Sequence, residues 1–105
     1  MKVELLYFDG CPSYEALLPV LRELLAGEGV EDEIELRQVE TAEDAERERF
    51  LGSPSIRVNG SDIEPHAEDR HDYGLKCRLY RNPDGLTGIP TEKWLVAALR
   101  NAAAN

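Results

Sequence analysis

Hydrophobic and polar positions follow two different periods in the first third of the chain. Residues 3–8 are apolar except at Glu4, a pattern typical of a strand that is buried on both faces. After turn residues at positions 9–10, five leucines between residues 17 and 25 recur at helical spacing, and Gly27 follows them. The pattern predicts a central strand, then an amphipathic helix that covers a core and ends near Gly27.

The next segments favour an edge strand and a short helix. Apolar and charged residues alternate from residue 34 toward residue 39, which predicts a strand near an edge of the sheet with one face in water. Thr41 precedes Asp44 by three residues and approximates a capping box, the start signal of a helix. We expect this helix over residues 42–51, largely exposed, with inner contacts from Ala45, Phe50 and Leu51.

A hairpin and a last helix are expected in the second half. Residues 56–58 alternate up to Asn59-Gly60, the commonest two-residue hairpin turn, and Ile63 continues the pattern beyond it. A final helix is expected from about Thr91, since apolar residues then recur on one helical face. These residues are Trp94, Leu95, Ala98, Leu99 and Ala102.

Residues 65–89 fit neither period well, because they are rich in Asp, Arg, Gly and Pro. Within them Leu75, Cys77 and Leu79 alternate as a short strand would. The predicted order is β-α-β-α-β-β-α with an insertion before the last helix, an α/β fold. A length of 105 residues is typical of one domain, so residues 1–105 are expected to form a single unit.

Charge and cysteine usage narrow the possible partners and compartments. The chain holds 21 acidic and 12 basic residues, a formal charge of -9 that repels polyanions, so nucleic acid is not expected as a partner. The longest apolar runs are far shorter than the roughly 20 residues that span a bilayer, and the N-terminus lacks the pattern of a signal peptide. We therefore expect a cytoplasmic protein without a membrane partner, whose two cysteines are thiols at rest.

One cysteine occupies a position that favours reactivity. The sequence FDGCPSY at residues 8–14 places Cys11 where the first strand turns into the first helix, with Pro12 in a favoured first-turn position. Unpaired backbone N–H groups and the helix dipole stabilise a thiolate there. We expect Cys11 to be an exposed nucleophilic thiol, while Tyr14 either donates a hydrogen bond to a bound sulfur or substrate or only packs.

These features together resemble the thioredoxin and glutaredoxin superfamily over most of the chain. A Cys-Pro pair stands at the first strand–helix junction, Pro19 follows Cys11 by eight residues inside the helix, and Ser53-Pro54 precedes a strand. The last pair resembles the cis-proline loop that faces the cysteine in that superfamily. The resemblance implies a thioredoxin-like fold, a cis Ser53–Pro54 bond, and a role for Pro12, Ser53 and Pro54 in positioning substrate.

The chain departs from that pattern at the second cysteine of Cys-x-x-Cys, which is replaced by Tyr14. What remains is a monothiol exchange, in which a mixed disulfide on Cys11 is resolved by glutathione, another protein or a distant cysteine. Cys77 is the only internal candidate, and its neighbours Lys76 and Arg78 would favour its thiolate. The alternative is that Cys77 is a small buried core residue on a strand.

Three functions are compatible with these residues. The first is a thiol–disulfide oxidoreductase or sulfur-exchange protein with Cys11 as nucleophile, Cys77 as a possible resolving thiol, and a protein thiol or small thiol such as glutathione as partner. The second is a thioredoxin-fold binding module without turnover. The third is soft-metal or organomercurial handling by the two thiols and Asp9, since small bacterial thioredoxin-like chains similar to this one are sometimes labelled alkylmercury lyase-like.

No cofactor and no resident metal are expected. His66, His71 and Cys77, with Asp69 and Asp72 nearby, supply suitable ligand types, but their spacing matches no zinc signature. The distance between the two cysteines discriminates among the functions, because a shared disulfide requires Cα atoms within about 7 Å.

Overall fold

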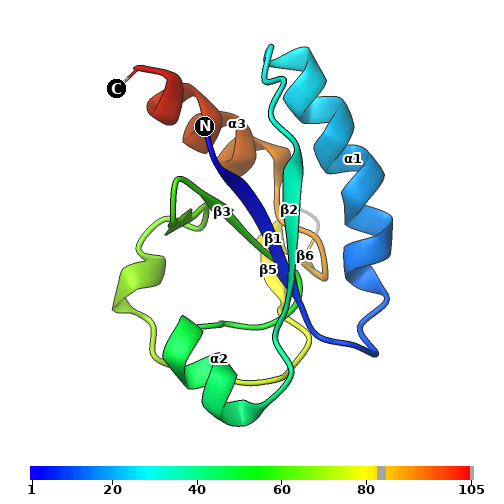
Figure 1. Ribbon diagram of the computed structural model, residues 1–105, viewed down its shortest axis with the longest axis vertical. Helices are drawn as coiled ribbons and strands as arrows, with labels where there is room; N and C mark the ends of the chain where they lie inside the picture. Colours follow the sequence, from blue (N-terminus) through cyan, green and yellow to red (C-terminus); the bar gives the residue numbers. More distant parts are fainter. Residues whose placement is uncertain (83–84, 105) are drawn as a thin grey trace.

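A computed structural model describes residues 1–82 and 85–104 as a mixed α/β structure, which confirms the predicted fold class (Figure 1). No helix in these ranges is both long and apolar enough to cross a bilayer. The elements are β1 (Val3–Tyr7), α1 (Ser13–Gly27), β2 (Ile34–Gln38), α2 (Ala42–Glu48), β3 (Ser55–Val58), β4 (Ser61–Asp62), the 3-10 helix η1 (Ala67–Asp69), β5 (Tyr80–Asn82), β6 (Gly85–Thr87) and α3 (Glu92–Ala104).

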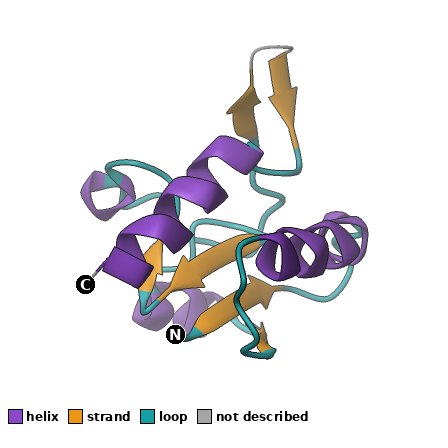
Figure 2. Cartoon of the chain, turned by 90° about the horizontal axis from the view of Figure 1, so that it is seen from above, coloured by secondary structure: helices purple, strands orange, loops and turns teal. Residues whose placement is uncertain are grey.

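Four strands form the main sheet, in the order β2-β1-β3-β4. β1 pairs in parallel with β2 and antiparallel with β3, and its first four residues are buried, so the predicted central strand is confirmed. β2 lies at one edge, as its alternating pattern predicted. β5 and β6 form a separate antiparallel ribbon that stands apart from this sheet (Figure 2).

Alternation along β1 divides the apolar side chains between two cores. Val3 and Leu5 pack on one side with the leucines of α1 and with Leu95 and Leu99 of α3. Leu6 points to the other side, where it packs with residues around α2. The second core consists of Leu6, Val39, Ala45 and Phe50. Both helical stripes are therefore confirmed, as are Ala45 and Phe50 as inner contacts of the short helix, while Leu51 is buried but belongs to neither cluster.

The predicted hairpin turn and helix cap are both present. Asn59 and Gly60 have φ angles of 51° and 86°, the left-handed conformations that a tight hairpin turn between β3 and β4 requires. The Thr41 hydroxyl accepts a hydrogen bond from the Asp44 N–H at 3.0 Å and caps α2. α2 ends earlier than predicted, because Arg49 adopts a left-handed conformation with φ of 54°.

The short strand that the alternation of residues 75–79 predicts does not form, and its apolar residues lie outward. Leu75 and Leu79 are 38% and 59% exposed, whereas Arg78 is 1% exposed and Tyr80 is fully buried. No regular strand includes residues 75–79, which are all among the described residues, and β5 begins only at Tyr80. An arginine takes the inward position because carboxylates of Asp62 and Glu64 meet it there.

Candidate functional site

Cys11 lies in the turn between β1 and α1, where its N–H donates to the carbonyl of Phe8 over 3.4 Å. Cys11 is only 1% exposed, so the expectation of an exposed thiol is wrong. The Cys11 sulfur takes part in two hydrogen bonds. The Cys11 thiol donates to the carbonyl oxygen of Ser53 at 3.5 Å, and the thiol of Cys77 donates to the Cys11 sulfur, also at 3.5 Å.

The loop that contacts Cys11 is placed by the sheet. β3 pairs antiparallel with β1, so Ser55 at the start of β3 lies opposite Leu6 near the end of β1. The residues just before β3 therefore meet the turn that follows β1. The Ser53–Pro54 peptide bond in this loop is cis, as the resemblance implied, and both residues are buried.

Cys77 is held in the site by backbone hydrogen bonds to the same loop. The Ser53 N–H donates to the Lys76 carbonyl at 2.8 Å, and the Arg78 N–H donates to the Ser53 carbonyl at 2.9 Å. The two backbone segments form an isolated parallel bridge between Ser53 and Cys77. Cys77 is exposed, so the alternative of a buried core cysteine is wrong. The structure thus brings together two thiols that lie 66 residues apart in the sequence.

Gly52 makes the close approach of these two segments possible. Its φ angle is +125°, a backbone conformation that residues with a side chain rarely adopt. A Cβ atom here would lie 2.9 Å from the Arg78 Cβ and 3.0 Å from the Lys76 carbonyl oxygen. Any larger residue would therefore have to displace the backbone that carries Cys77.

The surroundings of the two thiols give them opposite acidities. Burial raises the pKa of Cys11, but hydrogen bonds from Ser53, Ser13 and Cys77 outweigh it, and the pKa of Cys11 falls below its ordinary value. The hydrogen bond to Cys11, then burial and the charge on Cys11, raise the pKa of Cys77. Cys11 therefore ionises first, while Cys77 keeps its proton and donates it in a hydrogen bond to the thiolate.

Neither basic neighbour of Cys77 contributes to its acidity as expected. Lys76 pairs with Asp72 at 2.9 Å, and the guanidinium of Arg78 pairs with Asp62 at 2.7 Å. Both charges are neutralised by carboxylates instead of facing the sulfur. The expectation that they favour a Cys77 thiolate is wrong.

The Ser53 hydroxyl has no hydrogen-bond partner among the described residues while Cys11 is protonated. Ser53 is fully buried. A buried hydroxyl without a partner is uncommon and costs free energy. Ionised Cys11 supplies an acceptor, and hydrogen bonding from the Ser53 side chain is one cause of the lowered pKa of Cys11.

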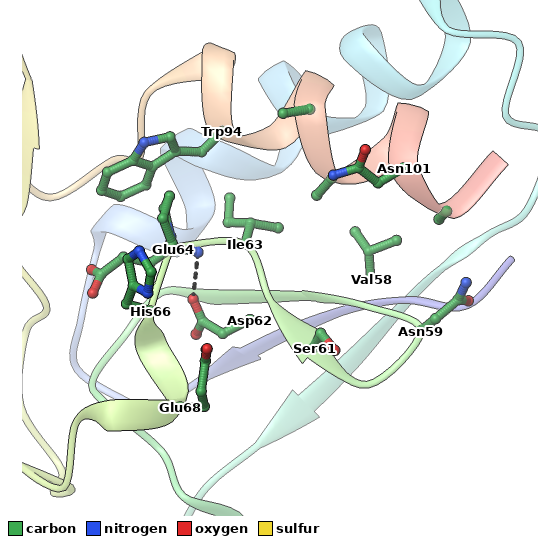
Figure 3. A pocket seen from close by; sticks show the side chains of 14 residues that line it. Val58, Asn59, Ser61, Asp62, Ile63, Glu64, His66, Glu68, Trp94 and Asn101 are labelled. Atoms are coloured by element: carbon green, nitrogen blue, oxygen red, sulfur yellow. Dashed lines mark hydrogen bonds between the residues drawn. The ribbon is translucent and has the colours of Figure 1, made fainter. Parts of the chain in front are cut away.

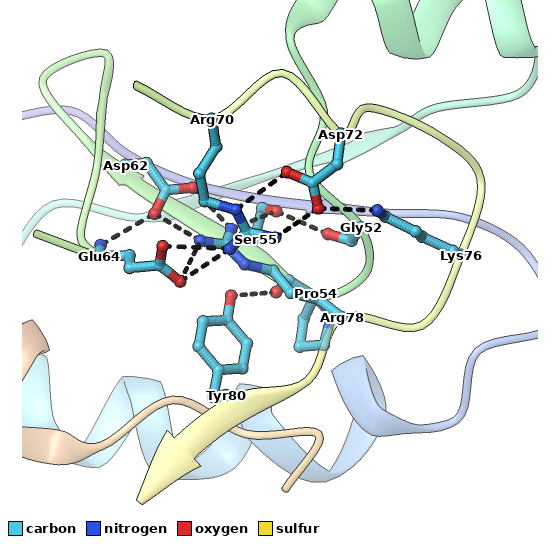
Figure 4. Close-up of polar contacts among 10 residues, drawn as sticks. All are labelled: Gly52, Pro54, Ser55, Asp62, Glu64, Arg70, Asp72, Lys76, Arg78 and Tyr80. Carbon is cyan, nitrogen blue, oxygen red and sulfur yellow. Dashed lines mark hydrogen bonds and ion pairs between the residues drawn. The ribbon is translucent and has the colours of Figure 1, made fainter. Parts of the chain in front are cut away.

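A network of charges surrounds the backbone of the Cys77 segment, defined here as residues 75–79 (Figure 4). Arg78 donates to Asp62 through both terminal nitrogens, at 2.7 and 3.0 Å, and to the hydroxyl of Ser55 at 2.9 Å. Its second terminal nitrogen also donates to Glu64 at 3.2 Å. Arg78, Asp62, Glu64 and Ser55 are called the Arg78 anchor below.

Pro12 and Tyr14 make no hydrogen bond to either thiol in the described part of the chain. Pro12 is exposed and caps the start of α1 without a side-chain hydrogen bond. The ring of Tyr14 stacks on Tyr7, with ring centroids 4.1 Å apart. This contact favours packing as the role of Tyr14.

The two histidines belong to separate groups of contacts, and neither hydrogen-bonds to a thiol in the described part of the chain. His66, Glu68 and Asp69 belong to the exposed turn around η1, with potential ligand atoms within 4.8 Å of one another. His66 and Glu68 line an open pocket of about 460 Å³ beside α3 (Figure 3). His71 instead contacts the hydroxyl of Tyr73 at 3.2 Å. No group of three ligand side chains among the described residues includes Cys77.

Sequence reasoning missed the residues that hold Cys77 in place. Gly52 carried a signal, since a glycine two residues before a proline marks a tight loop. Asp62 and Glu64 alternate after the hairpin, but nothing local indicated that Arg78 would bury its charge between them.

No family model, curated protein or solved structure matches this chain.

Proposed function

We propose that this protein is a thioredoxin-like thiol–disulfide oxidoreductase in which Cys11 and Cys77 are the redox pair. The observation that carries the proposal is the distance of 3.5 Å between the two sulfur atoms. A disulfide bond is about 2.05 Å long, so a movement of about 1.5 Å converts the contact into a bond. The thioredoxin-like assignment is supported by a cysteine at a strand–helix junction that faces a cis-proline loop.

The acidities of the two thiols support a division of roles. Cys11 has the lowered pKa and is the nucleophile, because the thiolate is the attacking species. Cys77 has the raised pKa and remains a thiol until a mixed disulfide forms on Cys11. Once the charge on Cys11 is lost in that bond, two of the causes that raise the pKa of Cys77 disappear with it. Cys77 then ionises more readily and resolves the mixed disulfide.

The proposed reaction proceeds in two exchange steps. The Cys11 thiolate attacks one sulfur of a substrate disulfide, forms a mixed disulfide, and expels the other half of the substrate as a thiolate that takes up a proton. The Cys77 thiol then loses its proton, attacks the Cys11 sulfur and expels the second half. The substrate gains two electrons and two protons, and the protein is left with a Cys11–Cys77 disulfide. Two equivalents of a small thiol such as glutathione, or a protein dithiol, return it to the reduced form.

Substrate access requires motion at Cys77. Cys11 is buried beneath Cys77, whereas Cys77 is exposed. A substrate disulfide reaches the Cys11 sulfur only after the Cys77 side chain turns aside. Ser53 also has both backbone groups bonded to the Cys77 segment, so it binds substrate backbone only when that segment is released.

Intact mass spectrometry in glutathione redox buffers tests the proposal. The wild-type protein should lose two hydrogen atoms at a defined glutathione ratio, without added glutathione mass. Cys77→Ser should instead accumulate a glutathione adduct on Cys11, and Cys11→Ser should form neither an internal disulfide nor that adduct. If wild type forms no internal disulfide at any ratio and Cys11 resists alkylation near neutral pH, the redox proposal fails and a binding module remains.

The same pair of thiols favours a second candidate, the binding of a two-coordinate soft cation such as Hg²⁺. Soft thiolates select soft metals, and the two sulfurs lie 3.5 Å apart, so they would move apart to hold the cation in a linear arrangement. Cleavage of an organomercurial has less support, since Asp9 is exposed and hydrogen-bonds to neither thiol in the described residues. Mercury that blocks alkylation of both cysteines with one-to-one stoichiometry would support binding, and independent alkylation of the two would oppose it.

A further inference from the structure

The position of Cys77 is not explained by a regular element. Leu75, Lys76 and Leu79 around it are exposed, and the local backbone belongs to no helix or strand. Two backbone hydrogen bonds to Ser53 fix its distance from the loop, at 2.8 and 2.9 Å. A segment with so few contacts needs a further attachment to keep its sulfur within 3.5 Å of another.

We propose that Arg78 is a positioning residue, whose buried guanidinium holds Cys77 against Cys11 and thereby sets the stability of the Cys11–Cys77 disulfide. The inference rests on the proposed function, because it concerns the same pair of thiols. It assigns to the Arg78 anchor a role in the redox equilibrium in addition to its contribution to folding.

The anchor joins the Cys77 segment to the main sheet. Asp62 belongs to β4 and Ser55 to β3, so both partners lie on the framework that also positions Cys11. Arg78 follows Cys77 directly in the chain and is 1% exposed. Its side chain lies among Ser55, Asp62 and Glu64 (Figure 4). The thiol of Cys77 lies 3.5 Å from that of Cys11. Movement of Cys77 away from the site would therefore pull the guanidinium away from Ser55, Asp62 and Glu64.

Both terminal nitrogens of the guanidinium are paired, whereas its buried Nε has no hydrogen-bond partner among the described residues. Burial opposes its charge, but the hydrogen bond to Asp62 and nearby charges outweigh burial and raise the pKa of Arg78, so the side chain stays ionised. Bidentate pairing with a carboxylate fixes both distance and direction. The guanidinium carbon also lies 4.6 Å from the ring centre of Tyr80, a cation–π contact that restrains its other face.

A second, more exposed set of charges continues around the segment. Arg70 pairs with Glu64 and Asp72, and Asp72 pairs with Lys76 on the other side of Cys77. The side chains of Asp72 and Lys76 are 49% and 44% exposed. Exposed pairs contribute little, because water and salt screen them. The buried Arg78 is therefore the residue on which the position of Cys77 depends most.

The consequence for the disulfide follows from effective concentration. The equilibrium constant of an internal disulfide against glutathione measures how often the two sulfurs meet in the reduced protein. Release of the anchor lets residues 75–79 sample positions farther from Cys11, and the equilibrium constant falls. A tenfold fall corresponds to about 30 mV for a two-electron couple.

The test is a redox titration of Arg78→Met against glutathione, with the internal disulfide quantified by intact mass. Methionine keeps much of the apolar length of the side chain and removes the charge. We expect at least a tenfold fall in the equilibrium constant relative to wild type. Arg100→Met is the matched control, since Arg100 is 72% exposed on α3 and pairs only with Glu28 among the contacts of the described residues. It should stay within twofold of wild type.

A second variant keeps the inference testable if Arg78→Met fails to fold. Asp62→Asn leaves Arg78 in place and weakens its bidentate partner, and we expect a fall of several fold in the same constant. Wild-type values in both Arg78→Met and Asp62→Asn, with native circular dichroism, would overturn the positioning role. Failure of wild type itself to form the disulfide would instead overturn the proposed function, so the two failures are distinguishable.

Discussion

Replacement of Gly52 by alanine should damage the site through one identifiable contact. The added Cβ would lie 2.9 Å from the Arg78 Cβ, 3.0 Å from the Lys76 carbonyl oxygen and 3.1 Å from the Arg78 Cα. Two of these three atoms belong to backbone, which cannot turn aside as a flexible side chain can. Relief of the overlap has to push residues 76–78 away from the loop that holds Cys11.

The expected cost has two parts. A non-glycine residue at a φ of +125° costs about 1–3 kcal/mol, and forced overpacking costs about 1–3 kcal/mol more. Gly85 separates them, because its φ is +123° and no atom of the described residues lies within 4 Å of the Cβ position. Gly85→Ala therefore carries the backbone part alone. Gly52→Ala should lose about 1–3 kcal/mol more than Gly85→Ala in free energy of unfolding.

Urea denaturation of the two reduced variants measures this difference. A glutathione titration of the same samples should show a weaker Cys11–Cys77 disulfide in Gly52→Ala and a wild-type equilibrium in Gly85→Ala. Equal losses of stability in the two variants, together with equal disulfide equilibria, would refute the claim that Gly52 is needed for the approach of the two segments.

Two further substitutions test individual hydrogen bonds. Ser53→Ala removes a donor to the Cys11 thiolate, so the pKa of Cys11 should rise and its alkylation at pH 7 should slow by about tenfold, measured by iodoacetamide kinetics across pH in a Cys77→Ala background. Its stability should not fall, because the lost hydroxyl has no other partner among the described residues, and an unchanged alkylation profile would contradict this role. Tyr80→Phe keeps the ring beside Arg78 but leaves the buried Pro54 carbonyl without its donor, so it should lower the free energy of unfolding by about 1–3 kcal/mol in urea, and wild-type stability would show that water replaces the bond.

Local and periodic features of the fold were predictable from the sequence. The central strand, the two apolar helical stripes and the Asn59-Gly60 hairpin follow from the spacing of apolar residues and from turn chemistry. Thr41 caps its helix through a contact that spans three residues. Each of these signals lies within about one turn of helix or one hairpin, so neighbouring residues suffice to specify it.

The Cys77 segment was not predictable in the same way. Its alternation of Leu75, Cys77 and Leu79 has the period of a strand but gives the wrong face, because periodicity alone does not say which side is buried. The choice was made by partners 14 to 23 residues away, which supply carboxylates and a hydroxyl to Arg78. Burial of two leucines would have left that guanidinium in water and Asp62 without its ion-pair partner among the described residues.

The energetics of the anchor suggest that it specifies position more than it adds stability. A buried ion pair gains little net free energy over apolar side chains of similar size, since desolvation offsets the attraction, whereas loss of one partner alone is costly. Arg78→Met combined with Asp62→Asn should therefore recover part of the stability that Arg78→Met loses. The double variant should nevertheless keep the weakened disulfide, because no charged side-chain contact remains between residue 78 and residue 62 of β4. Recovery of stability without recovery of the redox equilibrium would separate the two roles of Arg78, and joint recovery would show that the disulfide depends only on overall folding.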